Sequence, residues 1–303
     1  MSTAIAQSFS FGSLCCHFNG CINKVYFFFH SFFSPKVNVT ASQSELVKTY
    51  FGLGEQKWRE CIDGQHQDKG KFVYDKGLHG GTTEPGFIAS MEDAFQFVAN
   101  SLNRKVDARW YLQLHKRTCR HFNGDPSIFL MGQERVGVFR KSDVAANFSG
   151  VYQVTPEALT EFNALDRELK QIFGDAYGLG SFSDSGPGKK YLHYKSMTEK
   201  QVTTLFNYFL NNFHTEIESA STPDAKLWAI AKLHQRLEWL HPVLDGTSRT
   251  SIALMNKNLT DYGFHPALLE YPHVSSSYGL KQWFEYLKKG LQKWEQQKSS
   301  ISQ

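Results

Sequence analysis

The sequence has few features of a secreted or membrane-anchored protein. Its five cysteines are an odd number, and three of them, Cys15, Cys16 and Cys21, crowd the N-terminus. This pattern makes a poor disulfide framework and favours a reducing compartment. No Lys, Arg, Asp or Glu precedes Lys24, so the basic start of a secretory signal is missing, and the apolar stretch at residues 25–33 is about half as long as a membrane span. We therefore expect neither a signal peptide nor a transmembrane segment.

The sequence also lacks a strong excess of charge of one sign. Its 33 Lys and Arg residues against 29 Asp and Glu residues give a net charge of +4. So small an excess is too weak to indicate a nucleic-acid partner or an anionic membrane, and we expect no nucleic-acid partner. With 41% hydrophobic and 15% aromatic residues, the composition is that of a folded, globular chain.

Hydrophobic spacing predicts a mainly helical protein with a minor β component. We divide the chain into a Phe- and Cys-rich segment (residues 1–40), either disordered or packed on the core, a helical extension (41–114) and a main domain (115–297). Amphipathic periodicity predicts helices over residues 43–62, 90–118, 155–174, 198–217, 223–241, 248–262 and 279–296. Thr155-Pro156 and Thr222-Pro223 are typical helix starts, with threonine as the N-cap and proline at the first helical position.

A short β-hairpin is predicted between residues 137 and 154, where apolar and polar residues alternate around polar turn residues. Arg140 lies in this segment and is interpreted as an ordinary hairpin charge, with contact to a substrate as the alternative. Residues 180–190 faintly resemble a phosphate-binding loop, but Ser183 stands where glycine is needed, so a plain polar loop is the better interpretation.

One stretch, residues 241–250 (HPVLDGTSRT), gathers the chemistry of a reactive site at a junction between two helices. Small residues at a helix N-terminus leave backbone N–H groups free to bind phosphate. Arg249 offers a guanidinium fork for phosphate oxygens, and Asp245 is an oxygen ligand suited to Mg²⁺ held jointly with phosphates. His241 can accept a proton near neutral pH. The loop therefore combines a base, a metal ligand and an anion site.

The stretch resembles the motif of the Fic (Fido) family, whose usual form is HPFx(D/E)GNGRxxR. The residues that fall on this pattern are His241, Pro242, Asp245, Gly246 and Arg249. The segment around residues 137–152 and the helix after Thr155 resemble the family's target-binding flap and its next helix. The resemblance extends over the main domain and implies a Fic-like helical bundle with a short β-hairpin flap.

The resemblance implies a protein-modifying transferase, most simply a protein adenylyltransferase. His241 would act as the general base that deprotonates a Ser, Thr or Tyr hydroxyl of a target protein, and Asp245 would hold Mg²⁺. The nucleotide co-substrate, which is ATP, another NTP or an NDP-linked donor, would bind the nest formed by Gly246, Thr247, Ser248 and Arg249. The enzyme would transfer AMP or another nucleoside monophosphate, either in the cytoplasm or as a bacterial effector inside a host cell.

The sequence departs from the motif at four positions. Val243 replaces the phenylalanine, and Thr247 and Ser248 replace the asparagine and the second glycine with residues whose hydroxyls can contact phosphate. Ile252 stands where the second arginine, which holds the γ-phosphate in the family, would be. These changes leave two alternatives open: a catalytically altered Fic-like binding module, or a transferase that uses another nucleotide-linked donor and moves phosphocholine or a sugar.

Overall fold

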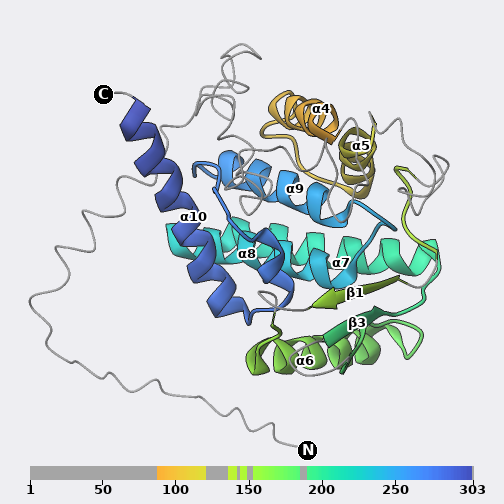
Figure 1. Cartoon of the computed structure of the whole chain (residues 1–303). Coiled ribbons are helices and arrows are strands. Elements are labelled where there is room, and N and C mark those ends of the chain that lie inside the picture. The colour runs from red at the N-terminus through yellow and green to blue at the C-terminus, as the bar shows by residue number, and fades with distance from the viewer. Residues whose placement is uncertain (1–86, 121–135, 142–143, 149–152, 185–189, 302–303) are drawn as a thin grey trace, which may run out of the picture.

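The computed structural model describes residues 87–120, 136–141, 144–148, 153–184 and 190–301 (Figure 1). Along the chain they form α4 (Phe87–Ala99), α5 (Ala108–Thr118), β1 (Val144–Phe148), α6 (Pro156–Phe173), β2 (Gly180–Asp184), β3 (Lys190–Tyr194), α7 (Glu199–Ser219), α8 (Pro223–Leu240), α9 (Thr247–Asp261), the 3₁₀-helix η5 (Pro272–Ser276) and α10 (Leu280–Ile301). The predicted fold class, mainly helical with a short hairpin, is confirmed.

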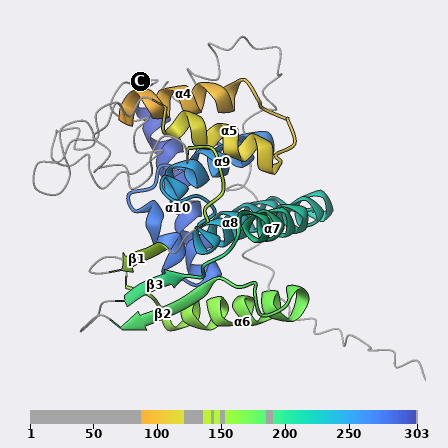
Figure 2. The same ribbon diagram turned by 90° about the vertical axis from the view of Figure 1, so that its right-hand side faces the viewer.

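Helix α8 lies at the centre of the bundle. It packs against α7, α9, α10 and η5, and α7 and α8 are joined by a short connection. Helices α4 and α5 cover α9 on one side, whereas the strands and α6 lie on the opposite side of α7 and α8 (Figures 1 and 2). The loop that leaves α8 and enters α9 is therefore enclosed by elements from distant parts of the sequence.

Two of the predicted helix starts are present with their predicted caps. The hydroxyl of Thr155 accepts a hydrogen bond from the backbone N–H of Ala158, and that of Thr222 accepts one from Ala225, each at 3.2 Å. A proline occupies the start of each helix. These bonds satisfy N–H groups that lack a partner within the helix, which explains why local sequence alone located both helices.

The helix predicted over residues 90–118 is wrong in one respect, because the segment is broken into α4 and α5. Asn103 adopts a φ of 59° in the break, and Asp107 starts α5 by accepting a hydrogen bond from the N–H of Trp110 at 2.6 Å. The helix predicted over residues 43–62 and the segment 1–40 lie outside the described residues. The division of the chain at residues 41 and 115 stays a prediction.

The strands form a three-stranded antiparallel sheet in the order β1–β3–β2. Leu192 of β3 pairs with Ala146 of β1 and with Phe182 of β2. The hairpin predicted over residues 137–154 is therefore misplaced, since β1 pairs with β3 and the hairpin partners are β2 and β3. The polar loop predicted over residues 180–190 is wrong as well, because both of its ends are strands. Pairing between segments distant in sequence overrode the local turn signals.

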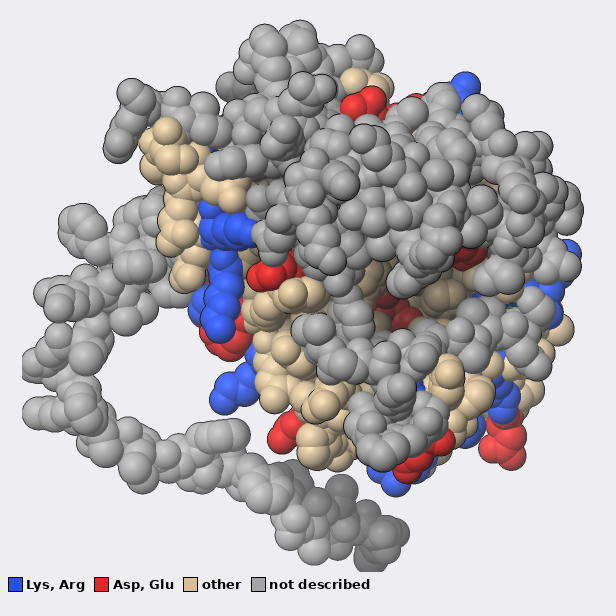
Figure 3. All heavy atoms as spheres, viewed as in Figure 1, with Lys and Arg blue, Asp and Glu red and all other residues tan. Residues whose placement is uncertain are grey.

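The surface carries charges of both signs. On the face shown in Figure 3, the Lys and Arg side chains of the described residues are interspersed with Asp and Glu side chains. Within the part of the chain that the structure describes, no helix combines the length and the hydropathy needed to cross a bilayer.

Candidate active site

The loop between α8 and α9 begins at His241, which has an unusual backbone conformation. His241 ends α8 as its C-cap with φ 48° and ψ 65°, in the left-handed region. Its backbone N–H still donates to the carbonyl of Leu237 at 2.9 Å. A residue other than glycine pays about 1–2 kcal/mol for this conformation, so other contacts must hold the turn in place.

Arg140 supplies those contacts. Its side chain is only 2% exposed, and its guanidinium donates to the main-chain carbonyls of His241 at 2.7 Å, Lys195 at 2.8 Å and Leu240 at 3.2 Å. Its backbone N–H donates to the carbonyl of Pro242 at 2.9 Å. A cation at the C-terminus of a helix also interacts favourably with the helix dipole. Arg140 is thus neither an ordinary hairpin charge nor a substrate contact, as the sequence suggested, but a buried clamp on the end of α8.

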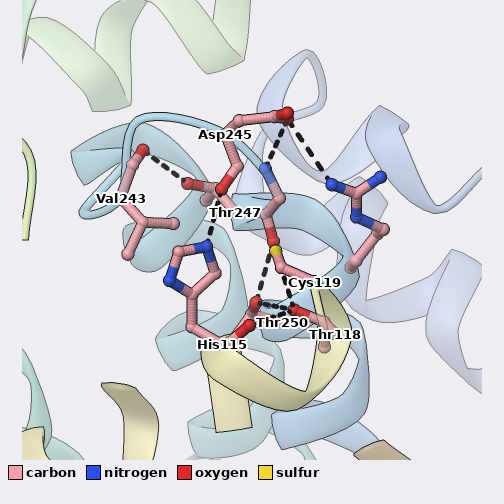
Figure 4. Close-up of polar contacts among 9 residues, drawn as sticks. His115, Thr118, Cys119, Val243, Asp245, Thr247 and Thr250 are labelled. Carbon is pink, nitrogen blue, oxygen red and sulfur yellow. Dashed lines mark hydrogen bonds and ion pairs between the residues drawn. The ribbon is translucent and has the colours of Figure 1, made fainter. Parts of the chain in front are cut away.

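His115 holds the other end of the loop. This buried residue of α5 accepts a hydrogen bond at Nδ1 from the N–H of Gly137 at 3.0 Å, and its Nε2 lies 3.0 Å from the main-chain oxygen of Asp245. Because a carbonyl can only accept, Nε2 carries the proton and the ring is neutral. Burial lowers the pKa of His115 to about 4, in keeping with this state. Figure 4 shows the ring pointing from α5 at the loop that carries Val243, Asp245 and Thr247. Both ring nitrogens are used, which argues against His115 as a metal ligand.

We expect the replacement His115→Phe to lower the free energy of unfolding by about 2–4 kcal/mol. The phenyl ring fills the space but leaves the carbonyl of Asp245 and the N–H of Gly137 buried without their partner. Urea denaturation followed by circular dichroism measures the loss. In the matched control His214→Phe, one bond of 3.3 Å to the carbonyl of Val106 is removed from a half-buried site, and a change of at most about 1 kcal/mol is expected. Equal losses in the two variants would contradict the role given to His115.

The predicted anion nest lies at the start of α9. Its N-cap, Gly246, has φ 73° and has no side chain with which to cap the helix. The backbone N–H groups of the first turn and the positive end of the helix dipole therefore have no side-chain cap. A Cβ at Gly246 would lie 3.2 Å from Nη2 of Arg249 and 3.3 Å from Sγ of Cys119. Arg249, the third residue of α9, lies beside this N-terminus. Geometry therefore brings Gly246 and Arg249 together as expected.

Thr247 and Ser248 stand where the Fic motif has asparagine and glycine, and the hydroxyls of both form hydrogen bonds within the protein. Thr247 donates to the carbonyl of Val243 at 3.2 Å, and Ser248 donates to Oε2 of Glu238 at 2.7 Å. Thr247 is 1% exposed. The side chains of both residues thus stabilise the turn, and their backbone N–H groups are the groups available to a bound anion.

Asp245 is the residue of the loop suited to a metal ion. Its Oδ1 accepts a hydrogen bond from the N–H of Gly246 at 2.6 Å and lies 3.7 Å from Nη2 of Arg249, and its side chain is 34% exposed. Among the described residues, no three His, Cys, Asp or Glu side chains gather into a metal site. Mg²⁺ in phosphate-binding sites usually takes one or two carboxylates together with phosphate oxygens and water. A single, partly exposed carboxylate beside an anion nest fits that donor set.

The ring of His241 is partly buried. It stacks on Tyr194 of β3 with the ring centroids 4.5 Å apart and an interplanar angle of 24°. Burial lowers its pKa to about 4, while the carboxylates of Glu238 and Asp245 raise it and Arg140 lowers it further. A hydrogen bond to the main chain of Leu244 also raises the pKa, as expected when the ring donates to a carbonyl. At neutral pH the ring is therefore an uncharged imidazole with one nitrogen left to accept a proton.

The sequence analysis missed the structural roles of three residues at the site: Arg140, Glu238 and His115. His115 did carry a signal, since it falls on the buried stripe of α5 with Trp110, Leu114 and Thr118. Arg140 and Glu238 had none, because their partners lie far along the chain or across a turn of unusual conformation.

Comparisons with known proteins give one family match. Residues 153–259 match the sequence model of the Fic/DOC family, whereas no curated protein matches the chain significantly. Similar solved structures include a Fic domain containing signalling protein from Bacteroides thetaiotaomicron VPI-5482 (10% identity, 91% of this chain and 95% of that chain, TM-score 0.48). They also include Fic-1, residues 134–508, from C. elegans (15% identity, 91% and 74%, TM-score 0.43). Both TM-scores lie below 0.5, so the assignment rests on the sequence match. The segment that is similar to the Fic/DOC family, residues 153–259, contains the loop between α8 and α9.

Proposed function

We propose that this protein transfers a nucleotide-derived group, AMP or another nucleoside monophosphate, to a hydroxyl side chain of a target protein. Fic domain proteins are generally transferases of AMP or other groups to proteins. The observation that carries the proposal is the loop itself, which joins an uncharged, partly buried imidazole at the end of α8 to an N-terminus without a side-chain cap at the start of α9. A base and an anion site on one short loop suit phosphoryl transfer, where positioning and electrostatics supply most of the catalysis.

His241 is the proposed general base. The free nitrogen of its ring accepts the proton of the target's hydroxyl as the oxygen attacks phosphorus. The new P–O bond forms while the bond to the leaving group breaks, and that group departs as pyrophosphate from ATP or another NTP. The clamp formed by Arg140 holds the backbone of His241 and thus the direction of the ring. Because burial keeps the ring uncharged at neutral pH, the base is ready before the target binds.

The nest at α9 would receive the phosphates of the donor. The N–H groups of its first turn and the guanidinium of Arg249 supply partial and full positive charge. Asp245 would hold Mg²⁺ jointly with the phosphates, and the ion would neutralise charge that develops on the phosphate oxygens. Asp245 also lies 3.7 Å from Arg249, which keeps the guanidinium next to the nest.

The position of the family's second arginine bears on the choice of donor. Ile252 occupies it and is 2% exposed, so this position offers no cation to a third phosphate. The proposal therefore extends to NDP-linked donors, from which phosphocholine or a sugar could be moved in the same nest by breaking a different bond.

Intact-mass spectrometry tests the proposal. Purified protein and a target-containing lysate would be incubated with Mg²⁺ and, one at a time, with ATP, UTP, GTP, CDP-choline and nucleotide sugars. We expect a mass increment on at least one protein with at least one donor, and the increment names the group transferred. If no donor yields an increment and none binds, the transferase is refuted in favour of a binding module.

A further inference from the structure

The proposed reaction leaves one buried charge at the site without a role. Glu238 lies on α8, three residues before His241, and is 4% exposed. Its Oε2 accepts the hydrogen bond from Ser248 at 2.7 Å, whereas its Oε1 is buried and has no hydrogen-bond partner among the described residues. Burying a half-satisfied carboxylate is costly, so its presence beside the candidate base calls for an explanation.

Tyr194 connects this carboxylate residue to the base. Its hydroxyl donates to the main-chain carbonyl of Glu238 at 3.4 Å, while its ring stacks on His241. Glu238, Tyr194 and His241 therefore form one packed group at the end of α8. Ser248 joins the group from the first turn of α9.

The charges that act on His241 come from α8, from the loop itself and from the segment that carries Arg140. Glu238 and Asp245 are acidic and raise its pKa, after the larger opposing effect of burial, whereas Arg140 lowers it. Glu238 also raises the pKa of three other titratable neighbours: Tyr111 of α5, Tyr194 of β3 and His234 of α8. Burial lowers the pKa of His234 and raises those of the two tyrosines, so all three are uncharged near neutral pH. Of the two carboxylates, Glu238 thus has the larger effect on the pKa of His241.

A buried base has two opposing requirements. It must be uncharged before the reaction, yet it must carry a positive charge once it has taken the proton. Burial and Arg140 meet the first requirement but oppose the second. A carboxylate nearby offsets part of that opposition, because an opposite charge favours the protonated form of a histidine.

We propose that Glu238 is a positioning residue for His241, whose carboxylate stabilises the imidazolium formed on proton transfer and whose bond to Ser248 fixes the first turn of α9 against α8. The proposal rests on the proposed function in taking His241 as the base. The charge coupling between the side chains of Glu238 and His241 can be measured without any transfer activity.

Histidine-detected NMR titration of the full chain in EDTA tests the coupling. We expect Glu238→Gln to lower the pKa of His241 by about one unit, because the amide keeps the size and a hydrogen-bonding oxygen but removes the charge. Ser248→Ala, which breaks the tether and keeps the carboxylate, should not lower it. Asp224→Asn, at the far end of the same helix, should leave it unchanged. A pKa that stays the same or rises in Glu238→Gln would overturn the proposal.

A second measurement avoids acid altogether. His241→Lys places at this position an ammonium group whose ordinary pKa, about 10.4, lies well above pH 7, and Glu238→Gln should then lower the urea midpoint at pH 7 more than it does in the wild-type background. Equal shifts in the two backgrounds would overturn the proposal. Absent transfer with the coupling intact would instead refute the proposed function alone.

Discussion

Replacing His241 by alanine should reduce transfer by about 10²–10⁴-fold while the protein remains folded. The variant removes the imidazole that accepts the proton, but it leaves the anion nest of α9 and Arg249 in place, so binding of the donor should persist. Rates of target modification, measured with the donor that the wild-type protein uses, give the comparison.

The fold should survive because Arg140 binds the main chain at this position. Its guanidinium donates to the carbonyl of residue 241 at 2.7 Å, a contact that does not depend on the side chain there. His214→Ala, on α7, is the matched control and should retain the wild-type rate. Wild-type transfer by His241→Ala would contradict the role of the base.

Replacing Arg140 by methionine should lower the free energy of unfolding by about 3–5 kcal/mol. Methionine keeps a long side chain in the same space, yet the carbonyls of Leu240, His241 and Lys195 lose their donors. The left-handed conformation of His241 loses its main support as well. Urea denaturation gives the change in unfolding free energy.

Arg167→Met, on the exposed face of α6, is the control for this effect. A surface arginine of this kind should change stability by at most about 0.5 kcal/mol. If Arg140→Met lowered the free energy of unfolding as little as Arg167→Met, the guanidinium of Arg140 would not hold the end of α8 and would not orient His241.

Local signals in the sequence were enough to find the helices on either side of the site. Thr222-Pro223 and the apolar stripe after it predicted α8, and residues 241–250 indicated the loop and its resemblance to the Fic motif. Each of these signals lies within a few residues of the structure it encodes. The same holds for Thr155 and the start of α6.

Most of the predictions that failed depend on contacts between distant residues. Strand β1 pairs with β3, which lies more than forty residues later in the chain, so alternation around residues 137–154 predicted a hairpin with the wrong partner. Arg140 was interpreted as a surface charge, because no residue near it in the sequence indicates that the last carbonyls of α8 lie beside it. The split between α4 and α5 was missed for a local reason, since Asp107 is a good N-cap inside a long amphipathic pattern.

Peptide mass spectrometry that locates the transferred group on a modified target, with wild-type protein, His241→Ala and His214→Ala run in parallel, tests the role of His241 directly. We expect a donor-derived group on a Ser, Thr or Tyr hydroxyl with wild type and His214→Ala, and no such group with His241→Ala. A group attached elsewhere, such as to a lysine amine, or one that is formed equally well by His241→Ala, would contradict this expectation.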